Sequence, residues 1–290
     1  AELHVDWQIK QAFLGRPIAT VQDDVDFWYH AGYDYAHLRA NYEYRMLGDG
    51  HAAEDHTYRG DMQVSKWVGD ETCLVGNWDQ FEAYPWPDPE TIDYSNLVEC
   101  ADCLYPGMKI ISGVGGIFTR VWRIMGFENL CFALVDQPDL VDALFKRIGA
   151  IQLEVFRRIV EMKGIGAMWY GDDLAYHTGT MIRPEDLRRH LFPWLAEMGA
   201  IAKAHSLPFI IHSDGNLWKV LPDLIQCGFN AIHPVEPKAM DGRELKKAYG
   251  DKICLLGNIE IGEILTIGTP EEVRAEVRRT IRDLAPGGGY

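Results

Sequence analysis

The sequence predicts an α/β protein with the architecture of a (β/α)8 TIM barrel. Eight short apolar segments with strand-forming side chains alternate with helical segments along the 290 residues, and that number of alternations is typical of a barrel. Several of these segments end at acidic or histidine side chains. A barrel would bring them to one mouth, because the carboxyl ends of its strands converge there.

The strands are expected in regular succession. The third runs into Gly113, Gly115 and Gly116, whose spacing matches neither the GxGxxG fingerprint of a doubly wound open sheet nor a phosphate-binding GK[ST] loop. We therefore favour the barrel over the open sheet and expect no nucleotide cofactor. The eight predicted strands are residues 2–6, 33–40, 108–112, 167–171, 208–211, 230–235, 253–256 and 287–290.

Helices are predicted between the strands from apolar periodicity and from terminal residues. Pro184 with its following acids, and Thr269 before a proline and two glutamates, are typical of helix starts. Gly228 is typical of a helix end. The predicted helical segments are residues 7–14, 18–31, 93–104, 121–162 with an interruption near 137–138, a segment from 183, 221–227, 242–249 and a segment from 269.

Residues 41–89 are the least regular part of the chain, and we expect an aromatic-rich lid or insertion there, after the second strand. Their tryptophans Trp67, Trp78 and Trp86 would exclude water or face a flat cofactor, or else belong to an ordinary core. A single barrel domain is expected over residues 1–290. Because both ends of the chain fall inside predicted strands, we also expect the parent protein to be slightly longer.

The charge of the chain restricts its partners. Lysine and arginine number 28 against 43 aspartates and glutamates, a formal net charge of −15. This balance argues against nucleic acid or an anionic membrane as partner, and against a polyanionic substrate unless basic residues cluster locally. No apolar segment is long enough to span a membrane and no signal peptide opens the chain, so we expect a cytoplasmic protein.

The six cysteines form no disulfide-like framework, which suits a reducing compartment. Cys100 and Cys103 make a single C-x-x-C in a segment with helical periodicity, without the second pair that a four-ligand zinc site requires. We therefore expect these two cysteines to reflect helix packing and not redox or zinc chemistry.

The stretch P-F-I-I-H-S-D-G-N, residues 208–216, is an apolar strand that ends in chemistry. His212 and Asp214 are two residues apart, so on an extended backbone they point the same way. The alternative is a core histidine beside an aspartate that caps the next helix.

Similar polar residues follow the other predicted strands. One histidine among carboxylates can ligate a divalent metal or can form a general acid–base pair, and the sequence does not separate the two. Some of the acids, Asp172, Asp173 and Glu260 in particular, would instead cap helices. His177 is a weaker candidate, and His233 is expected to point outward, away from Glu236. The candidate catalytic residues are Asp172, Asp173 and His212; those for metal binding are His212, Asp214 and Glu236; those for substrate binding are His4, Asp6, Trp86, Tyr170, Asn258 and Glu260.

A series of short motifs gives the chain a family resemblance. In order they are G-D-D-L, R-P-E-D-L-R-R-H-L-F-P, H-S-D-G-N, H-P-V-E-P, G-N-I-E and G-G-G-Y, within residues 84–290. Together they resemble the uroporphyrinogen decarboxylase superfamily. The resemblance implies a (β/α)8 barrel with one of two activities: cofactor-free decarboxylation in haem biosynthesis, or methyl transfer between a methyl donor, a corrinoid protein and a thiol.

The chain departs from the pattern of each branch at one place. The arginine-rich R-Q-A-G-R signature of the decarboxylases is absent, which favours the methyltransferases. Their zinc site, however, begins as H-x-C, and here Asp214 stands where the cysteine would be. A histidine and carboxylate set is harder and richer in oxygen, still able to hold zinc but no longer selective for it.

The leading hypothesis is therefore methyl transfer assisted by a divalent metal, zinc by family resemblance, held by His212, Asp214 and Glu236, with Asp172 or Asp173 orienting a small substrate. A corrinoid protein is the expected partner. The alternatives are a metal-free decarboxylase, in which Asp172 binds the substrate and His212 supplies the proton, and a non-catalytic barrel that binds a tetrapyrrole or corrinoid.

Overall fold

The computed structural model describes residues 5–42, 44 and 73–290, and its centre is a parallel sheet of six strands. The strands pair in chain order, β1-β2-β3-β6-β7-β8, which is the strand order of a (β/α)8 barrel. The predicted fold class is confirmed. The strands are β1 Tyr35–His37, β2 Lys109–Gly115, β3 Ile165–Gly171, β6 Phe209–His212, β7 Ala231–His233 and β8 Cys254–Leu255.

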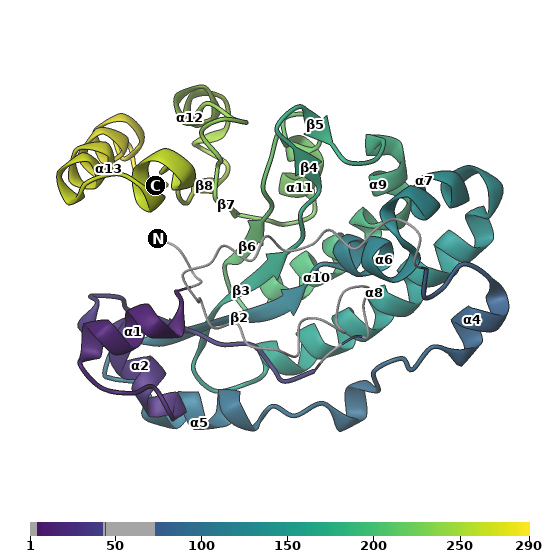
Figure 1. The fold of residues 1–290 in the computed structure, drawn as a ribbon, viewed down its shortest axis with the longest axis horizontal. Helices are drawn as coiled ribbons and strands as arrows, with labels where there is room; N and C mark the ends of the chain where they lie inside the picture. Colours follow the sequence, from purple (N-terminus) through teal and green to yellow (C-terminus); the bar gives the residue numbers. More distant parts are fainter. Residues whose placement is uncertain (1–4, 43, 45–72) are drawn as a thin grey trace.

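Helices connect these strands and cover the outside of the sheet; Figure 1 shows α8 and α10 packed along β2, β3 and β6. Within the described part of the chain, no helix is both long and apolar enough to cross a membrane. The helices are α1 Trp7–Leu14, α2 Val21–His30, α4 Trp78–Ala83, η1 Pro89–Thr91, α5 Ser95–Cys103, α6 Ile117–Met125, α7 Phe127–Asp136, α8 Pro138–Val160, α9 Pro184–His190, α10 Phe192–Ala204, α11 Leu221–Gln226, α12 Gly242–Tyr249, the π-helix η2 Ile261–Thr266 and α13 Pro270–Leu284.

The terminal residues that predicted helix boundaries act as expected. Thr269 caps α13 through a reciprocal pair of hydrogen bonds with Glu272. The expected interruption at residues 137–138 is confirmed, since α8 begins at Pro138. A second break was not predicted: Gly126 has a φ of 86° and separates α6 from α7, a left-handed conformation that glycine adopts without steric cost.

The first and last predicted strands differ from the six in the sheet. Residues 1–4, and with them most of the first predicted strand and His4, lie outside the described residues. The last segment, residues 287–290, is not a regular strand, but it lies beside β8, where the eighth strand of a barrel is expected. The amide of Leu255 donates to the carbonyl of Gly289, and the Tyr290 hydroxyl donates to the carbonyl of Gly257.

The expected insertion at residues 41–89 is only partly described. Residues 43 and 45–72, which include Trp67, lie outside the described residues. Within the described remainder of this segment, Trp78 begins the short helix α4.

A second, small sheet lies outside the insertion. It is a hairpin of β4 Ala175–Tyr176 and β5 Gly179–Thr180.

Side chains of the central sheet alternate between two apolar clusters, as expected for buried parallel strands. The larger cluster lies between the sheet and the helices and includes Met168 and Tyr170 of β3. The smaller lies on the inner face and centres on Trp169, with Ala167, Ile210 and Ala231. The inner face therefore carries a separate, narrow core beneath the carboxyl ends of the strands.

The C-x-x-C pair lies on α5, as the helical periodicity predicted. Cys100 is fully buried in the larger cluster, and burial raises the pKa of its thiol to about 12. A neutral, buried thiol is a packing residue, because thiolates are the reactive and metal-binding form.

Candidate functional site

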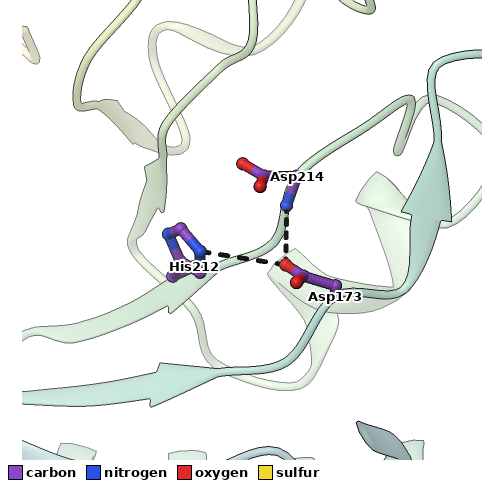
Figure 2. Close-up of side chains that lie close together, drawn as sticks. All are labelled: Asp173, His212 and Asp214. Carbon is purple, nitrogen blue, oxygen red and sulfur yellow. Dashed lines mark hydrogen bonds and ion pairs between the residues drawn. The ribbon is translucent and has the colours of Figure 1, made fainter. Parts of the chain in front are cut away.

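Three polar side chains gather at the carboxyl ends of β3 and β6. Asp173, His212 and Asp214 each offer a ligand atom, and these atoms lie within 4.8 Å of one another. Nε2 of His212 is 3.8 Å from Oδ1 of Asp173, and the same oxygen accepts a hydrogen bond from the amide of Asp214 at 3.1 Å (Figure 2). Asp173 and Asp214 are exposed and His212 is partly exposed. The group is therefore accessible from solvent.

The imidazole of His212 is held by neighbours on the inner face. It stacks on Trp169, with ring centroids 5.7 Å apart, and its Nδ1 lies 2.8 Å from Nδ1 of His233. One of these two nitrogens donates and the other accepts. When His212 carries its proton on Nδ1 and donates to His233, its Nε2 lone pair faces Asp173 and Asp214. That is the tautomer that a metal-binding histidine requires.

The position of His233 corrects the sequence prediction, which placed it outward. The residue is buried beside Trp169 and His212. The prediction extended the strand as far as Glu236, whereas β7 ends at His233 and Val235 has a left-handed φ of 50°. The register of the sheet places the residue, because β6 and β7 are parallel neighbours and His233 pairs with His212.

Asp172, next to Asp173, has a different environment. It is buried, and its carboxylate accepts hydrogen bonds from the amides of Phe118 and Thr119, the Thr119 hydroxyl and the Tyr170 hydroxyl, at 2.6–2.9 Å. Tyr170 in turn accepts from the amide of Ile117. Asp172 thus satisfies the free amides at the start of α6, and both side chains lie in the interior, not at solvent where substrate contacts were predicted.

Burial also changes the protonation of this pair. It raises the pKa of Asp172 to about 6, although the hydrogen bonds from Tyr170 and Thr119 act in the opposite direction. The pKa of Tyr170 is raised well above its usual value by burial and by the neighbouring carboxylate. The approach is close because residue 116 is glycine: a β-carbon at Gly116 would lie 2.1 Å from Oδ1 of Asp172.

The polar residues Glu236, after β7, and Asn258, after β8, bond to the backbone of the neighbouring loop that precedes each of them in the chain. Oε2 of Glu236 accepts from the amide of Gly215 at 3.0 Å, which places Glu236 outside the Asp173 group and not in the predicted metal set. Asn258 is buried and donates to the carbonyl of Val235 at 2.8 Å. Both side chains therefore fix loop geometry.

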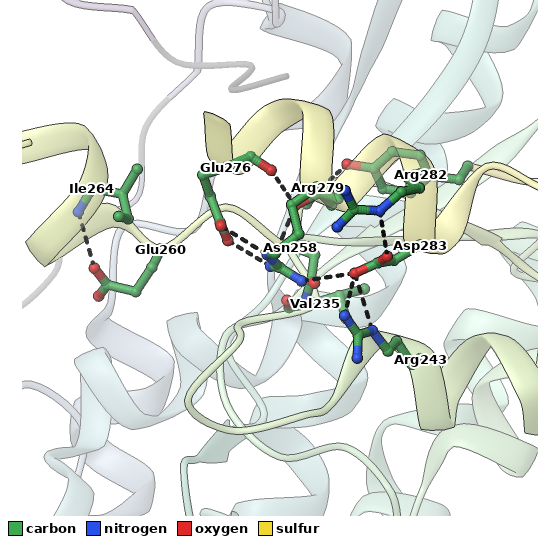
Figure 3. A network of polar contacts seen from close by, with 12 residues as sticks. Val235, Arg243, Asn258, Glu260, Ile264, Glu276, Arg279, Arg282 and Asp283 are labelled. Atoms are coloured by element: carbon green, nitrogen blue, oxygen red, sulfur yellow. Dashed lines mark hydrogen bonds and ion pairs between the residues drawn. The ribbon is translucent and has the colours of Figure 1, made fainter. Parts of the chain in front are cut away.

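Glu260 is a helix cap, the alternative that the sequence left open. Its carboxylate pairs with Lys238 and accepts amide hydrogen bonds at the start of η2, and the bond from the amide of Glu263 is the main cause that holds its pKa below the usual range. Nearby, Asp283 pairs with Arg243 and Arg279 and so joins α12 to α13 (Figure 3). The capped amides are those of Gly262, Glu263 and Ile264.

Two further predicted residues belong to other elements. Asp6 directly precedes α1. Trp86 is half-buried among Phe81 and Tyr84, and its indole donates to the carbonyl of Phe81 at 3.0 Å. The described structure thus places Trp86 in a local aromatic cluster.

The donor set of the Asp173 group fits a divalent metal. In a tetrahedral site with bonds of 2.0–2.1 Å, ligand atoms lie roughly 3.3 Å apart, close to the 3.8 Å between His212 and Asp173. One imidazole with two carboxylates leaves a fourth position for water or substrate, as catalytic zinc sites do. The contact of His212 with His233 supplies the outer hydrogen bond that orients such a ligand.

Comparison with known proteins places this geometry in a family. Residues 74–290, which contain the whole Asp173 group, match the family described as uroporphyrinogen decarboxylase (URO-D). The chain belongs to the uroporphyrinogen decarboxylase family. The family resemblance inferred from the motifs is confirmed.

Individual relatives agree on the family and differ in how much they cover. Methylcobamide:CoM methyltransferase MtaA of Methanosarcina barkeri is 25% identical over 188 residues, 63% of this chain and 53% of the relative. Its counterpart from the Fusaro strain is 24% identical over the same shares. The chain thus spans about half the length of the curated relatives it matches.

A solved structure supports the fold across nearly the whole chain. A methyltransferase from Methanosarcina mazei superposes with a TM-score of 0.65 at 16% identity, covering 97% of this chain and 83% of that protein. At this identity the likeness concerns the fold alone.

Proposed function

We propose that this protein is a methyltransferase of the uroporphyrinogen decarboxylase family that works with a divalent metal held by Asp173, His212 and Asp214. The observation that carries the proposal is the convergence of these three side chains, within 4.8 Å, at the strand ends where active sites of this fold lie. The similarity to methylcobamide:CoM methyltransferases supports methyl transfer as the reaction.

The metal, when bound, supplies Lewis acidity that stabilises a thiolate or polarises a methylated oxygen or nitrogen. The residues of the chain bind and orient. Asp173 and Asp214 provide negative charge beside the imidazole, and His233 holds His212 with its Nε2 directed toward them. Asp172 acts indirectly, because it fixes the loop between β2 and α6 and the start of the segment that carries Asp173.

The proposed substrates are a small methylated compound or a methylated corrinoid protein as donor and a small thiol as acceptor. The hypothesis of a non-catalytic barrel predicts that polar groups at the strand ends pair with one another. Glu236, Asn258 and Glu260 are engaged by backbone groups and by Lys238, whereas the Asp173 and Asp214 side chains are exposed beside His212. This difference favours an enzyme.

The test is a methyl-transfer assay with methylcobalamin as donor and a small thiol as acceptor. The reaction is monitored through the visible spectrum of the corrinoid. We expect transfer by the unmodified protein and a loss of more than about 100-fold in kcat/KM for His212→Ala and Asp173→Asn. Glu260→Gln, which alters a carboxylate outside the group, is the matched control and should keep its activity. Equal rates in all four proteins would contradict the proposal.

A further inference from the structure

Ser213 lies in the chain between His212 and Asp214, and only 3% of its surface is exposed. Its hydroxyl accepts a hydrogen bond from the amide of Leu174 at 3.0 Å and donates one to the carbonyl of Asp214 at 3.1 Å. Leu174 directly follows Asp173. One buried hydroxyl therefore joins the segment that carries Asp173 to the segment that carries Asp214.

This hydroxyl bonds the two segments where the backbone ladder between their strands ends. β3 and β6 pair in register as far as Gly171 and His212, and the amide of Asp172 adds one more bond, to the carbonyl of His212 at 2.9 Å. The amide of Leu174, two residues further on, bonds to the Ser213 hydroxyl and not to a backbone carbonyl. Serine side chains can replace ladder partners in this way.

Ser213 is also bonded to the strand on the other side of β6. Its amide donates to the carbonyl of His233, the last residue of β7, at 3.0 Å. Backbone and side chain together thus hold Ser213 between the ends of β3 and β7. Its position leaves little freedom to Asp214, the next residue.

The hydroxyl leaves the two carboxylates available. Leu174 is fully buried, so its amide needs an acceptor, because an unpaired buried donor costs free energy. Ser213 supplies that acceptor. The remaining link is the bond from the Asp214 amide to Oδ1 of Asp173, which Figure 2 shows between the two segments.

A second buried serine provides a comparison within the same sheet. Ser112 of β2 is fully buried, and its hydroxyl makes no hydrogen bond within the described part of the chain. Burial in this sheet therefore does not by itself give a serine hydroxyl a partner. Ser213 uses its hydroxyl both as donor and as acceptor.

We propose that Ser213 is a positioning residue of the metal centre, whose hydroxyl sets the separation of the Asp173 and Asp214 carboxylates before a metal binds. The inference rests on the proposed function for the metal centre itself. Groups that orient metal ligands without touching the metal typically change its affinity about 10–100-fold. Ligands whose spacing is set in advance lose less conformational freedom on binding.

The experiment is isothermal titration of chelator-stripped protein with Co²⁺, whose visible spectrum also reports the geometry of its ligands. We expect Ser213→Ala to bind Co²⁺ about 10-fold or more weakly than the parent protein, with a changed spectrum. Ser112→Ala removes a buried hydroxyl that has no partner among the described residues. It is the matched control and should bind like the parent protein.

A conservative variant and an unfolding measurement separate positioning from stability. Ser213→Thr keeps a hydroxyl and should bind Co²⁺ more tightly than Ser213→Ala. Urea unfolding without metal shows that each variant is folded, and sucrose in all titrations favours the folded state. A purely structural role would lower the stability of Ser213→Ala but leave the affinity of the folded protein at the parent value.

The outcomes separate this inference from the proposed function. Parent-like affinity in Ser213→Ala, an equal loss in Ser112→Ala, or a threonine variant no better than alanine would overturn the inference and leave the metal centre standing. No Co²⁺ binding by the parent protein would overturn both. Ser213-dependent binding in a protein that transfers no methyl group would retain the inference and remove the proposed reaction.

Discussion

The polar residues that follow β3 and β6 and those that follow β7 and β8 have different roles. After β3 and β6, Asp173 and Asp214 extend to solvent beside His212. After β7 and β8, Glu236 and Glu260 accept hydrogen bonds from backbone amides. All four are acids directly after or close to a strand end, so residue type and position do not distinguish them. What separates them is exposure: Asp173 accepts one amide hydrogen bond, from Asp214, yet both side chains are exposed beside His212, whereas Glu236 and Glu260 are partly buried against the backbone.

Asp172 and Asp173 show the same contrast within two adjacent residues. Asp172 turns inward, to the start of α6, and accepts four hydrogen bonds. Asp173 turns toward His212 and is half-exposed. An alternating backbone sends neighbouring side chains to opposite sides, so one of the pair is committed to structure and the other is left for chemistry.

The largest expected effect on stability is that of Asp172→Ala. The change leaves the buried amide of Phe118 and that of Thr119 without an acceptor, so we expect a loss of about 3–5 kcal/mol in the free energy of unfolding. Urea unfolding followed by circular dichroism measures it. Asp173→Ala, the matched control, should change stability by less than about 1 kcal/mol; similar losses in both variants would contradict the contrast.

A smaller, pH-dependent effect should distinguish Asp172→Asn from the parent protein. The pKa of Asp172 is raised from 3.8 to about 6, so its protonated form is favoured in the folded state. Its contribution to stability is therefore fully present below about pH 4 and is lost as the pH rises through about 6. Asparagine does not titrate.

The measurement is urea unfolding of both proteins between pH 4 and 7. The variant should be most destabilised relative to the parent at pH 4, and the gap should narrow as the pH rises. A gap that widens instead would mean that the four hydrogen bonds outweigh burial and lower the pKa of Asp172.

The fold was predictable from local pattern. Strand-forming runs and helix-terminal residues such as Pro138 and Thr269 have short-range causes, and the structure places elements there. The break at Gly126 also has a local cause, the positive φ of that glycine, which the sequence prediction did not use. The shortening of the second predicted strand to β1 depends on packing between elements, for which the sequence has no local signal.

The site was predictable only in part, because its contacts depend on strand register. His212 and Asp214 follow from alternation within one strand, but the neighbours His233 and Asp173 come from β7 and β3.

The central claim, that Asp173, His212 and Asp214 form a metal centre, is tested most directly by metal content. The full-length protein, purified without added metal, and its variants would be analysed by mass spectrometry. We predict near-stoichiometric divalent metal in the parent protein and in Glu236→Gln, and its loss in Asp173→Asn and His212→Ala. Metal absent from the parent, or lost in Glu236→Gln and kept in Asp173→Asn, would contradict the account.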